Sequence, residues 1–389
     1  MENTKIVGLL LPSYLLYVHE VVDGMVDYAA QHQHIHFCDL RFDHLDQARE
    51  LLSTANVDAL ISGINRTEFT ALKDNWPRRG PTINIHPAIL RHDILTVCVN
   101  EASKSRVAFD YLSGLGYIHF ASFGDSGEEA IDEWATELET LAHAQHFSHT
   151  LQKVAIPRAN DADTTSTQPD PAVDAWIREL PKPAAIVTEG GLSATILKQS
   201  ASRLGFNIPG EIAILSRNDD ETCLFSNPPI SAIRQRGPDI GRMALQILDT
   251  TLAGSRHPTG CTTIPSADVI ERGSTGFPAG IPDDIKQAAR YIRDYACDGI
   301  EVADVLKAVR SLSRTRLYEE FPKNFRHSPA AEIMRIRLDK AKAKLTQTNL
   351  TVGSIGDTCG FSSHSQFTDA FRREVGTTPL AWRKKHSRS

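Results

Sequence analysis

Residues 313–329 read SRTRLYEEFPKNFRHSP, and residues 363–379 read SHSQFTDAFRREVGTTP. At an offset of fifty positions, both stretches begin with serine and then carry an apolar residue or proline at every fourth position. Serine suits the N-cap of a helix, and apolar residues four positions apart lie on one helix face. Each copy therefore predicts a helix that begins after the serine and buries one side.

The repeat extends upstream of both helices. Apolar residues at the same offset precede each helix: Val302, Val305 and Val309 in the first copy, and Val352, Ile355 and Cys359 in the second. Between the copies, a helix over about 330–346 would carry one apolar side: Ile333, Leu338, Ala341 and Leu345. One copy alone buries little surface, so we expect both to pack on this common helix. Helix-turn-helix units often place a helix in the DNA major groove, and two in tandem predict that one chain reads two successive grooves.

The charge is divided between the two ends of the chain. The 389 residues carry a net charge of -6, with 41% apolar and 23% charged residues, as in ordinary soluble proteins. Residues 281–389 hold 20 Lys and Arg against 13 Asp and Glu, a net +7, whereas the remainder holds 22 against 35, a net -13. A basic segment on an acidic body favours a polyanionic partner for that segment alone.

The N-terminus and the cysteines predict a cytoplasmic protein. The apolar run Ile6–Leu11, ended by Pro12, is too short for a signal peptide or a membrane span, so we expect no membrane partner. The six cysteines form no CxxC pair, which is typical of reduced thiols in the cytosol.

Residues 5–275 alternate short apolar runs with longer amphipathic stretches. The strand candidates are Ile6–Leu11, Ala59–Ile61, Thr82–Ile85, His119–Phe123, Ala184–Thr188 and Ile212–Leu215. The helix candidates include Val21–Gln31, Lys104–Leu115, Ile131–Ala144 and Ser193–Leu204. This alternation predicts βαβ units with helices on both faces of parallel sheets, and the length favours two lobes.

Two segments read as connections. Arg158–Pro171 is polar and closed by prolines, which predicts a surface loop. Phe277–Asp284 holds two prolines and a glycine and ends in two aspartates that suit a helix start at Ile285. The expected organisation is a two-lobed α/β domain over 1–276, a linker over 277–284 and an all-α DNA-binding domain over 285–389.

The exposed faces of the two repeated helices supply the candidate DNA contacts. In the first copy these residues are Arg314, Thr315, Arg316 and Tyr318, and in the second they are His364, Ser365, Gln366 and Asp369. Arg can pair with guanine and Gln with adenine in the major groove. The cations Arg372, Arg373, Arg383, Lys384 and Lys385 are better placed for phosphates. Because the exposed faces differ, we expect the copies to read different halves of an asymmetric site.

The C-terminal segment resembles the AraC/XylS family of transcription regulators over roughly 285–386. The residues that carry the resemblance are Ile355–Phe361, Ser365–Phe367, Phe371–Arg373, Gly376–Pro379 and Trp382–Arg383, with Arg337, Leu338 and Ala341–Leu345 matching the family's linker helix. Gly356 stands where the family usually has Ala, at a cost of up to ~1 kcal/mol to the helix. Arg326 stands where the first copy usually has Gly, which leaves the turn after Phe321 open.

The first 275 residues resemble a second group, the cores of LacI/GalR regulators. The matching stretches are Val57–Ile61, Gly205–Pro209, Asn218–Asp220, Pro228–Ile233, Ile240–Gly241 and Val269–Ser274. The resemblance implies the two-lobed fold of periplasmic sugar-binding proteins, with a small molecule closed between the lobes. It also implies a sugar effector, such as a pentose, and a homodimer paired through these lobes.

Open α/β sheets bind ligands beyond the carboxyl ends of their strands. The candidate effector contacts are Ser13, Tyr14, Asn65, Asp125, Trp134, Glu189, Asp219 and Asp220. Two positions depart from the sugar-binding pattern that the resemblance implies. Asp132, Glu133 and Trp134 stand where an Arg is usual, and Glu189 to Gly191 stand where an Asp is usual.

Other chemistry has weaker support in the sequence. His32, His34 and His36 would share a face in a strand, and His143, His146 and His149 are three apart, a spacing that converges poorly on a helix. We predict no metal and no cofactor, and no nucleotide-binding or nucleophile motif indicates an enzyme. The predicted function is an effector-controlled transcription regulator, for which activation and repression both remain open. The alternative is a sugar-metabolising enzyme or a free binding protein with a basic tail.

Overall fold

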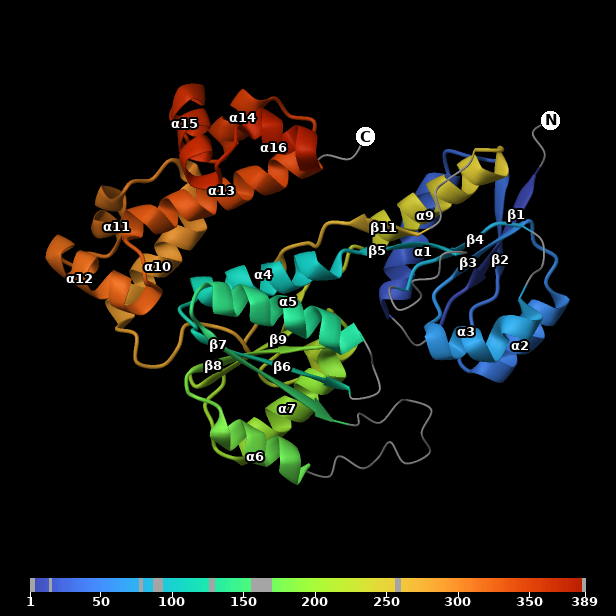
Figure 1. Cartoon of the computed structure of the whole chain (residues 1–389), viewed down its shortest axis with the longest axis horizontal. Coiled ribbons are helices and arrows are strands. Elements are labelled where there is room, and N and C mark those ends of the chain that lie inside the picture. Colours follow the sequence, from blue (N-terminus) through green and yellow to red (C-terminus); the bar gives the residue numbers. More distant parts are fainter. Residues whose placement is uncertain are drawn as a thin grey trace. The chain divides into compact units, whose positions relative to one another are not determined.

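The computed structural model describes residues 4–13, 16–76, 80–86, 94–125, 130–154, 170–255 and 260–386. The chain divides into two compact units, Met1–Pro278 and Ala279–Ser389 (Figure 1). The division falls inside the segment 277–284, where the sequence predicts a linker.

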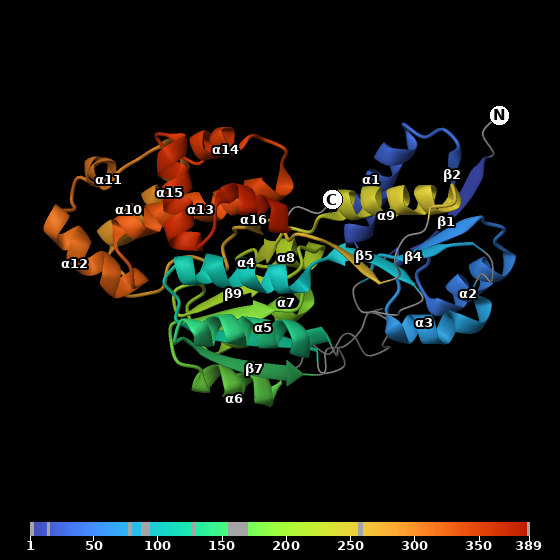
Figure 2. The ribbon, with the colours of Figure 1, turned by 45° about the horizontal axis from the view of Figure 1, so that its top comes forward.

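The first lobe of unit 1 is built on a parallel sheet in the order β11-β5-β4-β3-β1-β2. Its strands are β1 (Lys5–Leu10), β2 (Ile35–Asp39), β3 (Ala59–Ser62), β4 (Thr82–Asn84), β5 (Leu95–Val99) and β11 (Cys261–Ile264). Successive strand residues point to opposite faces. Val7 and Leu9 therefore join the core under α1 (Leu16–Ala29) and α9 (Gly237–Leu252), which lie side by side in both ribbon views (Figures 1 and 2). Leu10 joins the opposite core, under α2 (Leu45–Thr54), α3 (Arg66–Leu72) and η1 (Lys73–Asn75).

The second lobe repeats this plan in the order β12-β10-β9-β8-β6-β7, with only β12 antiparallel to its neighbour. Its strands are β6 (His119–Asp125), β7 (Ser148–Val154), β8 (Ala184–Thr188), β9 (Ile212–Ser216), β10 (Ser231–Ile233) and β12 (Val269–Ile270). One face packs on α4 (Glu101–Gly114) and α5 (Ala130–Ala144). The other face packs on α6 (Pro171–Glu179) and α7 (Gly191–Arg203), beside the short α8 (Glu221–Phe225).

The structure confirms the two-lobed α/β prediction and the six predicted strands. Within the described residues it adds strands that the sequence pattern misses: β2, β5, β7, β10, β11 and β12. Residues 158–169 of the predicted loop lie outside the described residues. Pro171, the last residue of that predicted loop, is the first residue of α6. In the described parts of the chain, no helix is long and apolar enough to cross a membrane.

The first group of histidines does not lie in one strand. Strand β2 begins at Ile35, so His32 and His34 precede it and share no strand face with His36. The ring of His32 stacks on Tyr28, and His34 Nε2 lies 2.7 Å from Asp249 Oδ1. The second group is spread over the end of α5, a turn and β7. No cluster of three or more metal-binding side chains occurs among the described residues.

Unit 2 is helical and contains the predicted repeat. Its helices are α10 (Asp283–Tyr295), η2 (Ala296–Asp298), α11 (Val302–Ala308), α12 (Arg314–Phe325), α13 (Pro329–Gln347), α14 (Val352–Thr358), α15 (His364–Val375) and α16 (Pro379–His386). Helix α10 begins two residues before the predicted start at Ile285. Helix α13 lies between the two copies, and the predicted apolar side of α13 is buried, as are Leu317 and Phe321 in the first copy and Phe367 and Phe371 in the second.

The two repeated helices have matching ends. Ser313 Oγ accepts a hydrogen bond from Arg316 N at 3.2 Å, and Ser363 Oγ accepts one from Gln366 N at 3.2 Å. At the other end, Arg326 has φ 63° and Gly376 has φ 78°, so both residues adopt the left-handed conformation. The turn after α12, which the sequence did not define, is therefore the same turn as the one after α15. A non-glycine residue such as Arg326 is strained in this conformation.

We expect Arg326→Gly to stabilise the C-terminus of α12 by about 1 kcal/mol, because glycine adopts positive φ without a Cβ clash. Hydrogen–deuterium exchange of the α12 amides in the full chain measures this local free energy. The matched control, Gly376→Ala, should destabilise α15 by a similar amount. A faster exchange in Arg326→Gly would show that the side-chain contacts of Arg326 outweigh its backbone strain.

Packing explains the glycine at position 356, although helix propensity disfavours glycine there. A Cβ at this position would lie 3.0 Å from Phe367 Cδ1 and 3.1 Å from Phe367 Cβ. The missing methyl group therefore lets α14 approach the buried ring of Phe367 closely. This close contact offsets the free-energy cost expected for glycine in a helix. An alanine at position 356 would require Phe367 to shift.

Candidate functional site: the helix faces of unit 2 and the strand ends of unit 1

The predicted face of α12 is open to solvent. Arg314, Thr315, Arg316 and Tyr318 are exposed, while Leu317 and Phe321 anchor the opposite side in the core. The guanidinium of Arg314 lies 5.5 Å from the ring centroid of Tyr318, one turn further along the helix. This contact orders two of the four predicted residues on the same face, where Arg can donate to base edges.

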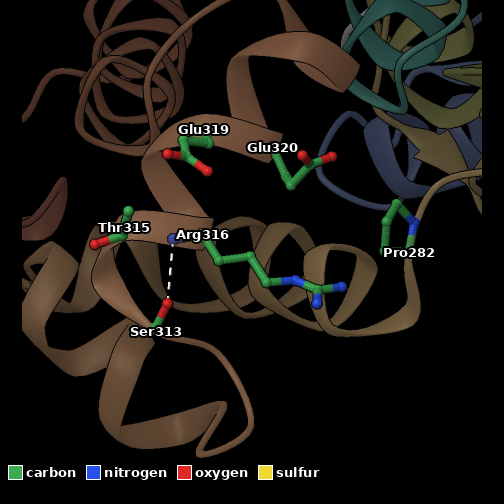
Figure 3. A pocket seen from close by; sticks show the side chains of 6 residues that line it. All are labelled: Pro282, Ser313, Thr315, Arg316, Glu319 and Glu320. Carbon is green, nitrogen blue, oxygen red and sulfur yellow. Dashed lines mark hydrogen bonds between the residues drawn. The ribbon is translucent and has the colours of Figure 1, made fainter.

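Arg316 is held to the start of α10 by an ion pair. Its Nε lies 2.9 Å from Asp284 Oδ2, and its Nη2 donates to Asp284 Oδ1 at 3.2 Å. In Figure 3 the side chain of Arg316 extends toward Pro282, while Thr315 points away from it. A shallow depression there is lined by Pro282, Ser313, Thr315, Arg316, Glu319 and Glu320.

The sequence reasoning did not select two residues of this region. Glu319 lies four positions after Thr315, so it shares the exposed face of α12, and its carboxylate could accept a hydrogen bond from cytosine. The helical spacing was a usable signal for Glu319. The sequence predicts Asp284 only as a helix-start residue, and nothing in its local sequence indicates a partner 32 positions away.

The second face, on α15, is also exposed but internally bonded. His364, Ser365, Gln366 and Asp369 all lie at the surface. Gln366 Oε1 accepts hydrogen bonds from Ser362 N and Ser362 Oγ, both at 2.9 Å. Pairing with adenine uses both the oxygen and the nitrogen of the Gln amide. Gln366 must therefore release Ser362 before it can make both bonds.

The cations predicted to bind phosphate fall into two groups. Arg372, Arg373, Lys384 and Lys385 are exposed, and Arg373 Nε lies 2.7 Å from Glu374 Oε1. Arg383 is instead half-buried and donates to two backbone carbonyls, Leu345 O at 3.2 Å and Leu350 O at 2.7 Å. The guanidinium of Arg383 thus satisfies carbonyl groups around the end of α13, and its phosphate contact stays a prediction.

In unit 1, the candidate effector residues follow the carboxyl ends of strands, as predicted. Ser13 follows β1, Asn65 follows β3, Asp125 ends β6, Glu189 follows β8, and Asp219 and Asp220 follow β9. Tyr14 lies outside the described residues. Trp134 is buried in the core under α5, at 3% exposure.

Several of these polar groups already hold the surrounding loops. Asn65 Oδ1 caps α3 by accepting from Glu68 N at 3.0 Å. Asp219 pairs with Arg272, whose Nη1 lies 2.7 Å from Asp219 Oδ1. Asp220 caps α8 and accepts from Gly191 N at 2.8 Å. These contacts give Asp219 and Asp220 a structural role at the strand ends, and they link β9 to distant segments.

A buried charge cluster beside these strand ends was not predicted. Lys104 Nζ lies 3.2 Å from Glu101 Oε1 and donates to Asn218 Oδ1 at 2.9 Å, and Arg217 Nη2 pairs with the second oxygen of Glu101. Burial lowers the pKa of both Lys104 and Arg217. Burial by itself raises the pKa of Glu101, but the two cations outweigh it and hold that pKa below its usual value.

The cluster continues onto Trp134 and His86. The guanidinium of Arg217 lies 4.4 Å from the ring centroid of Trp134. Burial lowers the pKa of His86 to about 4, with Glu101 raising it and Lys104 lowering it. Imidazole, amide and guanidinium groups are side chains that can hydrogen-bond the hydroxyl groups of a polar, uncharged effector.

Comparison with known proteins identifies both units. Residues 109–275 match the family described as periplasmic binding protein-like domain, and residues 308–385 match the family described as helix-turn-helix domain. The chain is a DNA-binding transcription regulator in which a periplasmic binding protein-like domain precedes a helix-turn-helix domain.

Individual relatives are similar over nearly the whole chain. The chain is 26% identical over 387 residues to the xylose operon regulatory protein of Escherichia coli (strain K12), which covers 98% of this chain and 97% of that protein. The solved structure of the xylose-binding transcription activator XylR shares the fold, with a TM-score of 0.60, 23% identity and full coverage of both chains. A LacI-type regulator from Alkaliphilus metalliredigens, solved with D-xylulofuranose, aligns over 70% of this chain and 99% of its own, with a TM-score of 0.54 and 17% identity.

Proposed function

We propose that this chain regulates transcription in response to a sugar, with pentoses as the first candidates. The observation that carries the proposal is the similarity to a xylose operon regulatory protein over 98% of the chain. The fold neighbour with bound D-xylulofuranose and the hydroxyl-binding groups at the strand ends support it. In this proposal the chain acts by binding alone, in the cytoplasm, with bounds of 1–276 for the effector domain and 285–389 for the DNA-binding domain.

The sugar is tested by thermal shift of the full chain against pentoses, hexoses and their acids. A ligand that binds only the folded state raises the melting temperature in a concentration-dependent way. We expect at least one pentose to do so. A flat response to every sugar would refute the sugar effector while leaving DNA binding untouched.

DNA binding is tested by gel shift with competitor DNA and a salt series. We expect Arg314→Ala and Gln366→Ala each to weaken the specific complex roughly tenfold or more, because a good bidentate base contact contributes about 1–3 kcal/mol. Lys323→Ala is the matched control, since Lys323 lies on α12 but pairs with Glu320 at 2.6 Å. Unchanged binding in both test variants would remove α12 and α15 as the reading helices. A chain with no specific complex at all would favour the alternative of an enzyme or free binding protein with a basic tail.

We further propose that two copies pair through the second lobe, and that effector closure changes how the pair presents its DNA-binding domains. Exposed apolar side chains support this: Leu192 of α7 and Leu224 and Phe225 of α8 are 46%, 54% and 82% exposed. Large apolar side chains this exposed suit an interaction surface.

Phe225→Glu should therefore convert a dimer to a monomer, because it places a charge in an apolar contact. Analytical ultracentrifugation of the full chain measures the mass, and Phe225→Leu, which keeps the patch apolar, should remain dimeric. A dimer that survives Phe225→Glu would place the interface elsewhere.

A further inference from the structure

The ion pair between Asp284 and Arg316 leaves one edge of the guanidinium open. Asp284 uses the side edge, since Nε and Nη2 face its two oxygens at 2.9 and 3.2 Å. The end edge keeps one hydrogen of Nη1 and one hydrogen of Nη2. These donors can serve the O6 and N7 acceptors of guanine.

Asp284 and Arg316 differ in exposure, as expected if Asp284 positions the side chain of Arg316. The side chain of Asp284 is only 14% exposed and lies in the first turn of α10, whereas the side chain of Arg316 is 52% exposed at the start of α12. The carboxylate is therefore the fixed partner, and it restrains a long side chain that would otherwise sample many rotamers. Restraining a side chain before binding lowers the entropy lost in the complex.

We propose that Asp284 is a positioning residue for specificity: it holds Arg316 by one edge so that the other edge reads a guanine in the DNA site. The inference rests on the proposed DNA binding by α12 and adds the residue that controls one of its contacts. A carboxylate near DNA repels phosphates, so Asp284 should lower affinity for non-specific DNA while it raises discrimination.

The chain supplies a matched control one residue away. Asp283 carries the same charge in the same helix turn, but its side chain is 90% exposed and its nearest cation is Lys286 at 3.6 Å. Asp283→Ala and Asp284→Ala therefore remove the same formal charge from the first turn of α10, and only the second releases Arg316.

The experiment measures the dissociation constants of the full chain for two duplexes at one salt concentration. The first duplex is selected from a random-sequence pool by the wild-type chain, and the second is its scrambled version. Asp284→Ala should bind the scrambled duplex more tightly and the selected duplex less tightly, so that the ratio falls about tenfold. Asp283→Ala should tighten binding to both duplexes and preserve the ratio. Tighter binding of Asp284→Ala to both duplexes, with the ratio kept, would overturn positioning and indicate an autoinhibitory pair.

A base-level readout separates positioning from a structural role. Replacing each guanine of the selected duplex by 7-deazaguanine removes its N7 acceptor. One such replacement should weaken wild-type binding yet have no effect on Asp284→Ala or Arg316→Ala. Arg316→Lys keeps the charge but lacks the two parallel N–H donors of the guanidinium, so it should behave like Arg316→Ala. If every replacement acts equally on all variants, the proposal fails. If the wild type binds both duplexes alike, the proposed function itself fails.

Discussion

Glu101→Ala should destabilise the effector-binding unit by about 3 kcal/mol or more, because it leaves two buried cations without their carboxylate. The side chains of Arg217 and Lys104 are 4% and 9% exposed, and both pair with Glu101. Arg217 directly follows β9, and Lys104 of α4 also donates to Asn218 in the same loop. The loss should appear as a lower melting temperature of the full chain, by roughly 10 °C for a unit of this size.

A surface ion pair in the same unit provides the control for that prediction. Glu137 lies 3.9 Å from Arg106, and their side chains are 34% and 60% exposed. Exposed pairs contribute about 0–1 kcal/mol, so Glu137→Ala should barely change the melting temperature. Equal shifts for the two variants would mean that water already solvates the Glu101 cluster.

The second large effect is an acid-dependent loss of stability at Glu332. Burial raises the pKa of this carboxyl, but Arg335 and His327 outweigh it and lower the pKa to about 2. The side chain is 5% exposed, with Arg335 Nε and His327 Nε2 each 2.7 Å from Oε2. Because the folded pKa is depressed, this stability is present above the unfolded value of about 4.3 and is lost as pH falls toward 2.

A depression of about two pKa units corresponds to about 3 kcal/mol. Glu332→Gln should therefore be less stable than the wild type at pH 7, and the difference should shrink as pH falls from about 4.5 to 2. Hydrogen–deuterium exchange of the α13 amides across this range follows unit 2 within the full chain. Glu374→Gln is the control, because Glu374 pairs with Arg373 at the surface. A constant difference between Glu332→Gln and wild type at every pH would contradict the ionic role.

The strands that the sequence predicted and those it missed differ in their place in the sheet. The predicted strands β1, β3, β4, β6, β8 and β9 are all interior, and their apolar runs are long enough to recognise. The four edge strands β2, β7, β11 and β12 were all missed. Edge strands are solvated along one side, so β7 reads SHTLQKV with polar residues at most positions. Of the interior strands, β5 and the short β10 were also missed.

The same distinction applies to the candidate sites. The caps Ser313 and Ser363 and the exposed faces of α12 and α15 follow from local spacing, so sequence reasoning found them. The partner of Arg316 and the partner of Asp219 depend on contacts 32 and 53 positions away. Such pairs depend on how distant segments pack, which no local pattern contains.

Helix α13 also sets a rule for the arrangement of the DNA site. Its 19 residues form a spacer of about 28 Å, anchored near its middle where Arg337 donates to Ala296 O and Ile300 O at 2.7 Å. One turn of DNA spans about 34–36 Å and 10–10.5 base pairs. Two sequence elements in phase by one turn present their grooves on the same side of the duplex. Inserting half a turn between them rotates one element to the far side, and a continuous helix cannot twist to follow it. If α12 and α15 both enter the major groove, we therefore expect the operator to be defined by helical phase as well as by bases.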